Sequence, residues 1–370
     1  MWFKLCDKMP FYIEWHFCIK EVKLFTPDLY TDIVWVERIS YKLENFKKVS
    51  GGQNVYNCRC PVCGDSKKRQ NISRFYVYTS KSNCLNVDCK NCGYGKTFYN
   101  FMKDVFPDDF IDYKKEQISS IFGRREYKKP KKDDKSIPTH EHVEVNEPKP
   151  QEYVKYLTAI DSLDDSHEAK KYLKKRSLPD AAMSKLFYCD RFKELCETIS
   201  YKPLAKNFPD EPRIIIPFYS VDGDLEMIQG RCLSSNGFRY ITIKCSPDVD
   251  KVFGKNHIDV DKTTYVCEGP FDSLFVDNCV ATCDSSLTRV NVDTYIWDNE
   301  PRNPDIHRIM LSAIKNGKNI VIWPFSPERK IDINDMINSG ITQPELMSII
   351  KDNTYSGPKA LIEFYKWKKI

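Results

Sequence analysis

The stretch "YVCEGPFDSLF", Tyr265 to Phe275, places a carboxylate directly between a short apolar run and a Gly-Pro break. The β-branched and aromatic run Thr263 to Cys267 is typical of a buried strand, and Pro270 suits the first turn of a helix. We therefore expect Glu268 at the carboxyl end of a strand, which is the edge where an open parallel sheet binds ligands. Asp272 falls in the first turn of the expected helix, where a carboxylate complements the helix N-terminus.

Two more acidic turns follow at intervals that suit parallel crossovers. "TYIW", residues 294–297, is a second strand-like run, and it leads into "DNEPRN" with Asp298 and Glu300. A third run, "NIVIWPF", residues 319–325, precedes "KIDINDMI", which contains Asp332. Because strand, turn and helix units of roughly thirty residues build parallel sheets, we expect these carboxylates to converge at one sheet edge. Carboxylate oxygens beside substrate phosphates are the ligands that Mg²⁺ uses in phosphoryl and nucleotidyl transfer.

Two Cys-x-x-Cys pairs lie nearer the N-terminus, in "CRCPVCGDS" (58–66) and "CLNVDCKNCGYG" (84–95). Each pair is followed by Gly, which is typical of the knuckles of a zinc ribbon, so the pattern predicts one structural Zn²⁺ held by four thiolates. The predicted ligands are Cys60, Cys63, Cys89 and Cys92. Cys58 and Cys84 are spare thiols, either of which could replace a predicted ligand. A thioredoxin-type redox pair would explain one of the two motifs but not both.

Composition narrows the class of protein. The 370 residues favour two or more domains, and the net charge of +5 permits nucleic acid as a partner without demanding it. The chain contains no run of about 18 apolar residues, so we expect neither a membrane-spanning helix nor a secretory signal, and the 15 Cys then indicate a reducing compartment. Basic and aromatic residues around the Cys pairs suit single-stranded nucleic acid, the alternative being a solvated face on a protein-binding ribbon.

The middle of the chain divides at a change in composition. Residues 123–150 have four Pro, few aliphatic residues and blocks of like charge, which indicates a flexible linker. Ser166–Leu178 has the pattern of a basic helix, with Asp165 as its expected N-cap. Arg213–Lys244 has strand-turn-strand signals, with the turn signals at 222–223 and 230–231.

These motifs resemble known proteins. "CEGPFDSLF", "WDNEPRN" and the stretch around Asp332 resemble the Toprim fold, with Glu300 standing where the usual pattern has a second Asp. "YLKKRSL" and residues 213–244 resemble the polymerase domain of bacterial-type primases. Zinc ribbon, linker, basic subdomain and Toprim in this order resemble the DNA primases of T-even-type bacteriophages.

The resemblance implies an α/β fold in which an N-terminal zinc ribbon is joined by a linker to a polymerase domain. That domain would have a mixed α+β basic subdomain and a Toprim α/β subdomain. The expected boundaries are 1–36 for an N-terminal extension, 37–122 for the zinc ribbon, 123–150 for the linker, 151–261 for the basic subdomain, 262–350 for Toprim and 351–370 for a C-terminal tail.

The implied activity is DNA-dependent synthesis of short RNA primers on single-stranded DNA. The expected catalytic residues and ligands of one or more Mg²⁺ ions are Glu268, Asp298 and Glu300. Asp332 is expected beside them, and Asp272 supports the site or the start of its helix. Arg213, Arg231 and Lys244 would lie on the basic surface that carries template and incoming nucleotide.

The implied partners are a single-stranded DNA template, ribonucleoside triphosphates, a hexameric replicative helicase and, as a further candidate, a single-strand binding protein. The expected location is the cytoplasm of the host cell. Met1–Val36 and Lys359–Ile370 are candidate docking surfaces for the helicase. Two alternatives remain open: a Toprim nuclease, which uses water and needs no nucleotides, and a non-catalytic mediator that clamps DNA and recruits partners.

Overall fold

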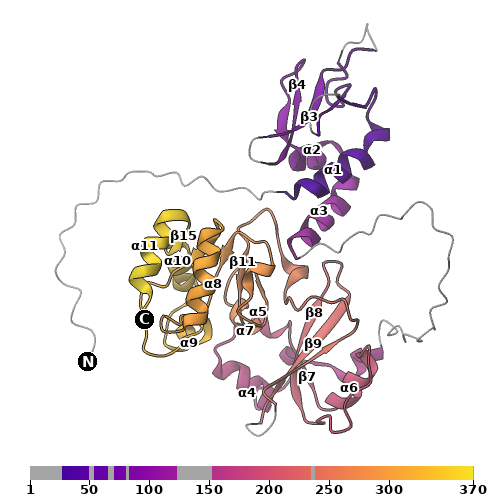
Figure 1. The fold of residues 1–370 in the computed structure, drawn as a ribbon. Helices are drawn as coiled ribbons and strands as arrows, with labels where there is room; N and C mark the ends of the chain where they lie inside the picture. The colour runs from indigo at the N-terminus through magenta and orange to yellow at the C-terminus, as the bar shows by residue number, and fades with distance from the viewer. Residues whose placement is uncertain are drawn as a thin grey trace, which may run out of the picture.

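The computed structural model describes residues 27–49, 54–65, 71–80, 83–122, 152–234 and 238–369. Within these residues, three five-stranded sheets follow one another along the chain (Figure 1), and the α/β class expected from the sequence is confirmed. The expected linker and residues 1–26 of the expected N-terminal extension lie outside the described residues. None of the helices in the described ranges is long and apolar enough to cross a bilayer.

The N-terminal sheet is antiparallel and runs in the order β1-β2-β3-β4-β5. Its strands are β1 (Lys47–Lys48), β2 (Tyr56–Cys58), β3 (Phe75–Thr79), β4 (Leu85–Cys89) and β5 (Gly95–Thr97), and its helices are α1 (Leu29–Arg38), η1 (Ser40–Lys42), α2 (Phe98–Val105) and α3 (Pro107–Ile121). Residues in β3 and β4 alternate between buried and half-buried, because one face of this sheet packs on the helices. Phe75 of β3 meets Phe101 of α2 with ring centroids 5.1 Å apart.

The middle sheet is also antiparallel, in the order β10-β9-β8-β7-β6. Its elements are η2 (Glu152–Tyr156), β6 (Thr158–Ala159), η3 (Ile160–Ser162), α4 (Glu168–Lys175), α5 (Asp180–Met183), β7 (Phe187–Cys189), α6 (Phe192–Ile199), β8 (Arg213–Tyr219), β9 (Leu225–Cys232) and β10 (Tyr240–Lys244). The expected turn at 222–223 joins β8 to β9, and Gly223 supplies its left-handed conformation. The turn expected at 230–231 is wrong, since both residues lie inside β9. A Cβ at Gly230 would stand 2.6 Å from the Phe192 ring, so Gly serves close packing there.

The helix cap expected before α4 is also wrong. His167 is the N-cap residue, and its Nδ1 accepts a hydrogen bond from the backbone of Ala169. Asp165 instead forms ion pairs with Lys170 (3.1 Å) and Lys174 (2.8 Å). Two basic side chains one turn apart therefore draw the carboxylate away from the helix N-terminus.

The C-terminal sheet runs in the order β12-β11-β13-β14-β15, with the first four strands parallel and β15 antiparallel to β14. Its elements are η4 (Lys255–His257), β11 (Tyr265–Cys267), α7 (Pro270–Ser273), β12 (Cys279–Ala281), η5 (Leu287–Arg289), β13 (Thr294–Tyr295), α8 (Pro304–Lys315), β14 (Asn319–Val321), α9 (Ile333–Asn338), α10 (Gln343–Asp352), β15 (Thr354–Tyr355) and α11 (Gly357–Trp367). The chain leaves β11 to form β12 on one side and returns to form β13 on the other. This reversal is a topological switch point, and ligands bind beyond the carboxyl ends of such strands.

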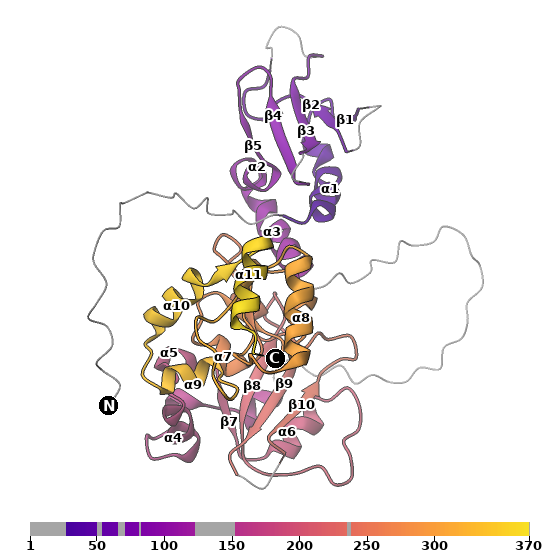
Figure 2. The same cartoon turned by 60° about the vertical axis from the view of Figure 1, so that its left-hand side comes forward.

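The segment after residue 350, taken from the sequence as a tail, contributes to this part of the fold. β15 extends the sheet at β14. α11 packs against α8 (Figures 1 and 2). The N-terminal sheet stands at one end, and α3 leads from it towards the C-terminal sheet (Figure 2). There the backbone amide of Asn291 donates to the carbonyl of Ile121 at 2.8 Å, and Lys114 pairs with Asp261 at 3.0 Å.

Candidate active site and metal centre

The first two acidic turns meet beyond the carboxyl ends of β11 and β13. Pairing of the two strands continues past β13, because the Ile296 amide donates to the carbonyl of Val266 at 2.8 Å. Glu268 follows β11 directly, and its carbonyl accepts a hydrogen bond from the Cys283 amide at 2.8 Å. Its Oε1 lies 3.5 Å from the amide nitrogen of Asp298. The parallel register therefore brings these two carboxylates to the switch point from turns thirty residues apart.

Glu300 joins the cluster through a lysine. The Nζ of Lys330 lies 2.6 Å from Oδ2 of Asp298 and 2.8 Å from Oε1 of Glu300. The residue between the two acids, Asn299, forms an antiparallel bridge with Ile331, with N to O distances of 2.9 and 3.2 Å. The acidic loop after β13 and the loop before α9 are thus held side by side.

Asp272 and Asp332 each lie at the start of a helix, Asp272 in α7 and Asp332 before α9. Asp332 is the N-cap of α9 and accepts a hydrogen bond from the Asp335 amide at 2.7 Å. Asp272, buried in α7, accepts a hydrogen bond from the Asn334 amide at 2.9 Å and so ties α7 to α9. Since Asp332 and Asp298 both repel its charge, Asp272 belongs to the same electrostatic cluster.

The cluster favours a bound cation. Burial, followed by repulsion from Asp298, raises the pKa of Glu268 to about 7. Burial raises the pKa of Asp298 to about 6, although Lys330 opposes the rise. Burial and the neighbouring carboxylates raise the pKa of Asp272 well above its usual range. Carboxylates crowded in this way lower their mutual repulsion by taking up protons or a metal ion.

Arg176 approaches this cluster from the middle part of the fold, and Arg231 contacts the same tyrosine as Arg176. Arg176, just after α4, donates to Oδ1 of Asn334 at 3.0 Å, and its guanidinium lies over the Tyr172 ring at 5.2 Å. The guanidinium of Arg231 lies over Tyr240 at 4.8 Å and over Tyr172 at 5.4 Å. Its Nε and Nη1 are buried without a hydrogen-bond partner in the described structure. Guanidinium donors without a protein partner can form charge-assisted hydrogen bonds with phosphate oxygens.

Arg176 and Lys330 were missed in the sequence. Arg176 belongs to the basic run of "KKYLKKRSL", which is usually a solvated helix face. Its position just past the end of the helix is the signal that distinguishes Arg176 from the solvated lysines, because a side chain there can turn back onto another element. Lys330 stands two residues before Asp332, and a cation next to an acidic motif is the corresponding signal.

The surface position expected for Arg213 is wrong. This residue is fully buried, with its guanidinium 5.1 Å over the Phe192 ring. It donates to the carbonyls of Gly230 and Phe238, both at 2.9 Å, and to the carboxylate of Glu211. Its hydrogen bonds therefore hold β8 to β9 and leave no donor facing solvent.

Lys244 also makes an internal contact. It is half-buried at the end of β10, and its Nζ donates to the carbonyl of Val249 at 2.7 Å. This bond fixes the loop that follows β10. The ammonium of Lys244 therefore serves a backbone contact, unlike the guanidinium groups of Arg176 and Arg231.

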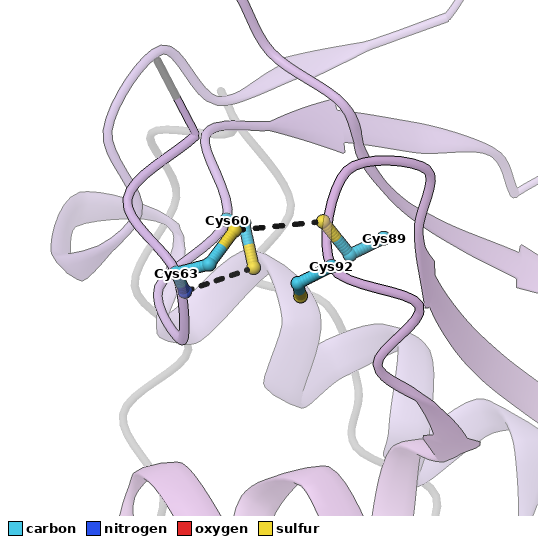
Figure 3. A group of neighbouring side chains, drawn as sticks. All are labelled: Cys60, Cys63, Cys89 and Cys92. Carbon is cyan, nitrogen blue, oxygen red and sulfur yellow. Dashed lines mark hydrogen bonds between the residues drawn. The ribbon is translucent and has the colours of Figure 1, made fainter. Parts of the chain in front are cut away.

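The four predicted zinc ligands come together in the N-terminal sheet. The Sγ atoms of Cys60, Cys63, Cys89 and Cys92 all lie within 4.8 Å of one another, and the side chains point towards one another (Figure 3). Gly64 and Gly93, one residue after each pair, adopt left-handed conformations that close the two turns. Cys58 is buried in β2 outside this group. Four thiols at this spacing suit a tetrahedral Zn²⁺.

Comparison with known proteins identifies the family. The chain is 33% identical over 356 residues to the DNA primase of Enterobacteria phage T4, a match that covers 92% of this chain and 100% of that protein. No family model matches the sequence. This extent of similarity shows that the chain belongs to the DNA primase family, whose members are RNA-synthesising nucleotidyltransferases.

Solved primase structures are also similar to the chain. The zinc-binding and RNA polymerase domains of the Aquifex aeolicus primase match with 20% identity and a TM-score of 0.42, covering 90% of this chain and 86% of that one. The Escherichia coli primase catalytic core matches with 14% identity and a TM-score of 0.42, covering 57% and 80%. The RNA polymerase domain of the Mycobacterium tuberculosis primase, in complex with a double-stranded DNA oligomer, matches with 17% identity and a TM-score of 0.43, covering 57% and 79%.

Proposed function

We propose that this primase makes short RNA primers on single-stranded DNA, with Glu268, Asp298 and Glu300 as the ligands of one or more catalytic Mg²⁺ ions. The observation that carries the proposal is the meeting of these carboxylates at the switch point of the parallel sheet. Asp332 stands at the next helix start and completes the acidic set. In this assignment the C-terminal sheet is a Toprim subdomain.

The donor set suits Mg²⁺ on chemical grounds. All the donors are carboxylate oxygens, which this hard cation prefers, and they are partly withdrawn from water. The Lys330 ammonium lies 2.6 Å from Asp298 and 2.8 Å from Glu300. A positive charge therefore fits between these two carboxylates. When bound, Mg²⁺ supplies charge stabilisation to the phosphates that react. The contribution of the protein is to hold the carboxylates in place before substrate arrives.

The two arginines then serve the incoming nucleotide and the template. Arg231 has two buried donors without partners, and Arg176 lies beside the acidic cluster through Asn334. Guanidinium groups neutralise and orient a triphosphate through charge-assisted hydrogen bonds. Tyr172 and Tyr240 hold these groups by cation–π contact, which fixes the direction of their free donors. We assign no nucleotide contact to Arg213 and none to Lys244.

The four thiols of the N-terminal sheet would hold one structural Zn²⁺, and the ribbon would select the template. We propose the boundaries 37–122 for the ribbon, 151–261 for the basic subdomain and 262–350 for Toprim. The first two sheets fall within their ranges, and the third does so except for β15, which comes from the segment after residue 350. Asn291 and Asp261, which contact the ribbon helix α3, precede β13 and β11, whereas Glu268 follows β11. The ribbon therefore lies at the opposite sheet edge, and residues 123–150 would act as the tether that lets it reach its own active site or that of a second subunit.

Further partners follow from the same assignment. A primase acts where a helicase exposes single strands, so a hexameric replicative helicase and a single-strand binding protein are the proposed partners, with the host cytoplasm as the location. Residues 359–369 form most of α11 and its end, and three exposed apolar side chains on it, Leu361, Ile362 and Tyr365, support this helix as the surface that meets the helicase. The first 26 residues lie outside the described structure.

The test is incorporation of radiolabelled ribonucleotides on single-stranded DNA. We expect labelled oligomers that require template, Mg²⁺ and all the ribonucleoside triphosphates specified by the template. A Toprim nuclease would instead shorten the DNA in the absence of nucleotides. A non-catalytic mediator would bind the DNA and give neither product. Either of these two results would overturn the proposed function.

A further inference from the structure

Lys330 occupies the position between two carboxylates that the proposed function gives to a metal ion. Its Nζ contacts both Asp298 and Glu300, whose side chains are only 9% and 16% exposed. It also acts electrostatically on Glu268. Burial lowers the pKa of this lysine, but the neighbouring carboxylates raise it by more, so the side chain is a permanent cation at neutral pH.

The backbone sets this contact. The bridge between Asn299 and Ile331 is antiparallel, so residue 330 stands beside residue 300 in the two aligned loops. The lysine therefore reaches the acidic pair by register rather than by chance rotation of a long surface side chain. An ordinary exposed pair, such as Lys366 with Glu363 on α11, has a single partner and no such support.

Two cations that share the same carboxylate oxygens repel each other. At 2.6 and 2.8 Å the ammonium occupies one oxygen of Asp298 and one of Glu300, and a divalent ion placed there would be repelled by it. We propose that Lys330 is the resident counter-ion of the acidic cluster and that it competes with the divalent cation and withdraws when that cation binds. This inference rests on the metal site of the proposed function.

The structure provides room for the withdrawal. A cleft of about 370 Å³ adjoins the cluster, and it is lined by Glu300, Arg302, Asn303, Glu328 and Arg329 as well as by Lys330 itself. The lysine side chain is about half exposed, so it can turn into this cleft without disturbing a packed core. The outcome is that Asp298 and Glu300 keep a cationic partner before metal arrives, at the cost of weaker metal binding.

The experiment measures binding of Mn²⁺, as a probe for Mg²⁺, to the full-length zinc-loaded protein by isothermal titration calorimetry. We compare the wild type with Lys330→Met, which keeps the length of the side chain and removes its charge. Lys366→Met is the matched control, since it removes an ion-paired lysine whose partner is Glu363 rather than Asp298 or Glu300. We expect Lys330→Met to bind Mn²⁺ roughly tenfold more tightly and Lys366→Met to bind as the wild type does.

Thermal unfolding supplies a second reading. Without Mn²⁺, Lys330→Met should unfold at a lower temperature than the wild type, because its carboxylates repel one another unopposed. With saturating Mn²⁺ it should gain more in unfolding temperature than the wild type gains. If the wild type binds Mn²⁺ and Lys330→Met binds it equally or more weakly, the counter-ion role of Lys330 is wrong, but the metal site is not.

A third variant separates this inference from the proposed function. Glu268→Gln removes a predicted metal ligand and should lose the Mn²⁺ binding that the wild type shows. If the wild type, Lys330→Met and Glu268→Gln all bind Mn²⁺ equally weakly, the metal site itself is absent and both proposals are wrong. If only Glu268→Gln loses binding while Lys330→Met matches the wild type, the metal site stands and the counter-ion role does not.

Discussion

The indole Nε1 of Trp367, in the last turn of α11, donates a hydrogen bond of 2.9 Å to Oδ1 of Asn299, the residue between Asp298 and Glu300. Asn299 is fully buried, and its Nδ2 donates in turn to the carbonyl of Phe325 at 3.0 Å. The C-terminal helix therefore holds the acidic loop from behind. Trp367 is a positioning residue in this account, acting on the carboxylates through the asparagine.

Replacing Trp367 with Phe tests this link, because one aromatic ring is kept while the N–H is lost together with the five-membered ring, the same atoms that the Trp35 control loses. The change leaves Oδ1 of Asn299 buried without a donor, so we expect the free energy of unfolding to fall by about 1–3 kcal/mol. We also expect kcat for primer synthesis to fall several-fold, with the KM for nucleotides little changed, because the loop loses its fixed position. Chemical denaturation and steady-state priming measure the two effects.

The matched control is Trp35→Phe. Trp35 Nε1 donates to Oε2 of Glu116 at 2.9 Å in the helices of the N-terminal sheet, far from the acidic loop. This variant should lose stability without a change in kcat at saturating template. A Trp367→Phe protein that is destabilised but primes at the wild-type kcat would show that the tryptophan has a structural role only.

Zinc content distinguishes the thiols of the N-terminal sheet. Cys63→Ser should lose the metal, since its Sγ is one of the four clustered donors, whereas Cys58→Ser should keep one zinc per chain. The free energy at stake is large, on the order of 10 kcal/mol for structural zinc sites. We therefore expect loss of zinc to unfold the ribbon, seen as rapid proteolysis of residues 37–122, while the other two sheets stay protected. Zinc retained by Cys63→Ser would contradict the ligand assignment.

A buried carboxyl group in the ribbon helices predicts a dependence of stability on pH. Burial raises the pKa of Asp32 to about 7, even though Tyr113 and Gln117 donate hydrogen bonds to its Oδ1 at 2.5 and 2.7 Å. Because the folded pKa lies above that of the unfolded chain, the stability it contributes is present below about pH 4 and is lost as the pH rises to about 7. Between pH 6 and pH 8 the loss should be about 1 kcal/mol.

Asp32→Asn removes the titrating group and keeps its shape. We expect the variant to be more stable than the wild type at pH 8 and to lose the pH dependence. Hydrogen exchange of the α1 and α3 amides, corrected for intrinsic rates, reports on this region alone. A variant that is less stable than the wild type at pH 8 would mean that the buried carboxylate is stabilised in its charged form.

Arg231 is predicted to bind a phosphate group of the nucleotide or template. Arg231→Met removes two buried donors that lack partners, and losing a charge-assisted contact of about 1.5–3 kcal/mol should raise the KM for nucleotides or the Kd for template roughly 10- to 100-fold. Arg191→Met is the control, since Arg191 also lies over a tyrosine ring, Tyr156 at 4.9 Å, and is paired with Glu194. Equal effects of the two changes would contradict a specific role for Arg231.

The order of the acidic turns could be predicted from the sequence because each depends on local chemistry. An apolar run before Glu268 and a Gly-Pro break after it specify a strand end and a helix start, and parallel strands put successive turns on one edge. Two Cys-x-x-Cys-Gly motifs likewise specify their own turns. The strands are shorter than the apolar runs that predict them: β13 ends at Tyr295, two residues before its run ends, and β14 ends at Val321, four residues before its run ends.

Contacts between distant segments could not be predicted in this way. Arg213 is buried because Phe192 of α6 covers it, and the residue pattern of β8 does not predict that contact. Arg176 reaches the acidic cluster through Asn334, 158 residues further along the chain. Lys330 faces Glu300 only because two loops pair through a single backbone bridge. Each of these positions depends on tertiary packing, which local pattern does not encode.

The central claim is that Glu268 helps to bind the catalytic metal ion, and primer synthesis by Glu268→Gln on single-stranded DNA tests it most directly. The amide keeps the size of the side chain and removes the charge that would bind the cation. We expect the rate of primer synthesis to fall on the order of a thousandfold, which corresponds to a barrier about 4 kcal/mol higher, and we expect template binding to be unchanged. Priming by Glu268→Gln at the wild-type rate in Mg²⁺ would contradict the claim.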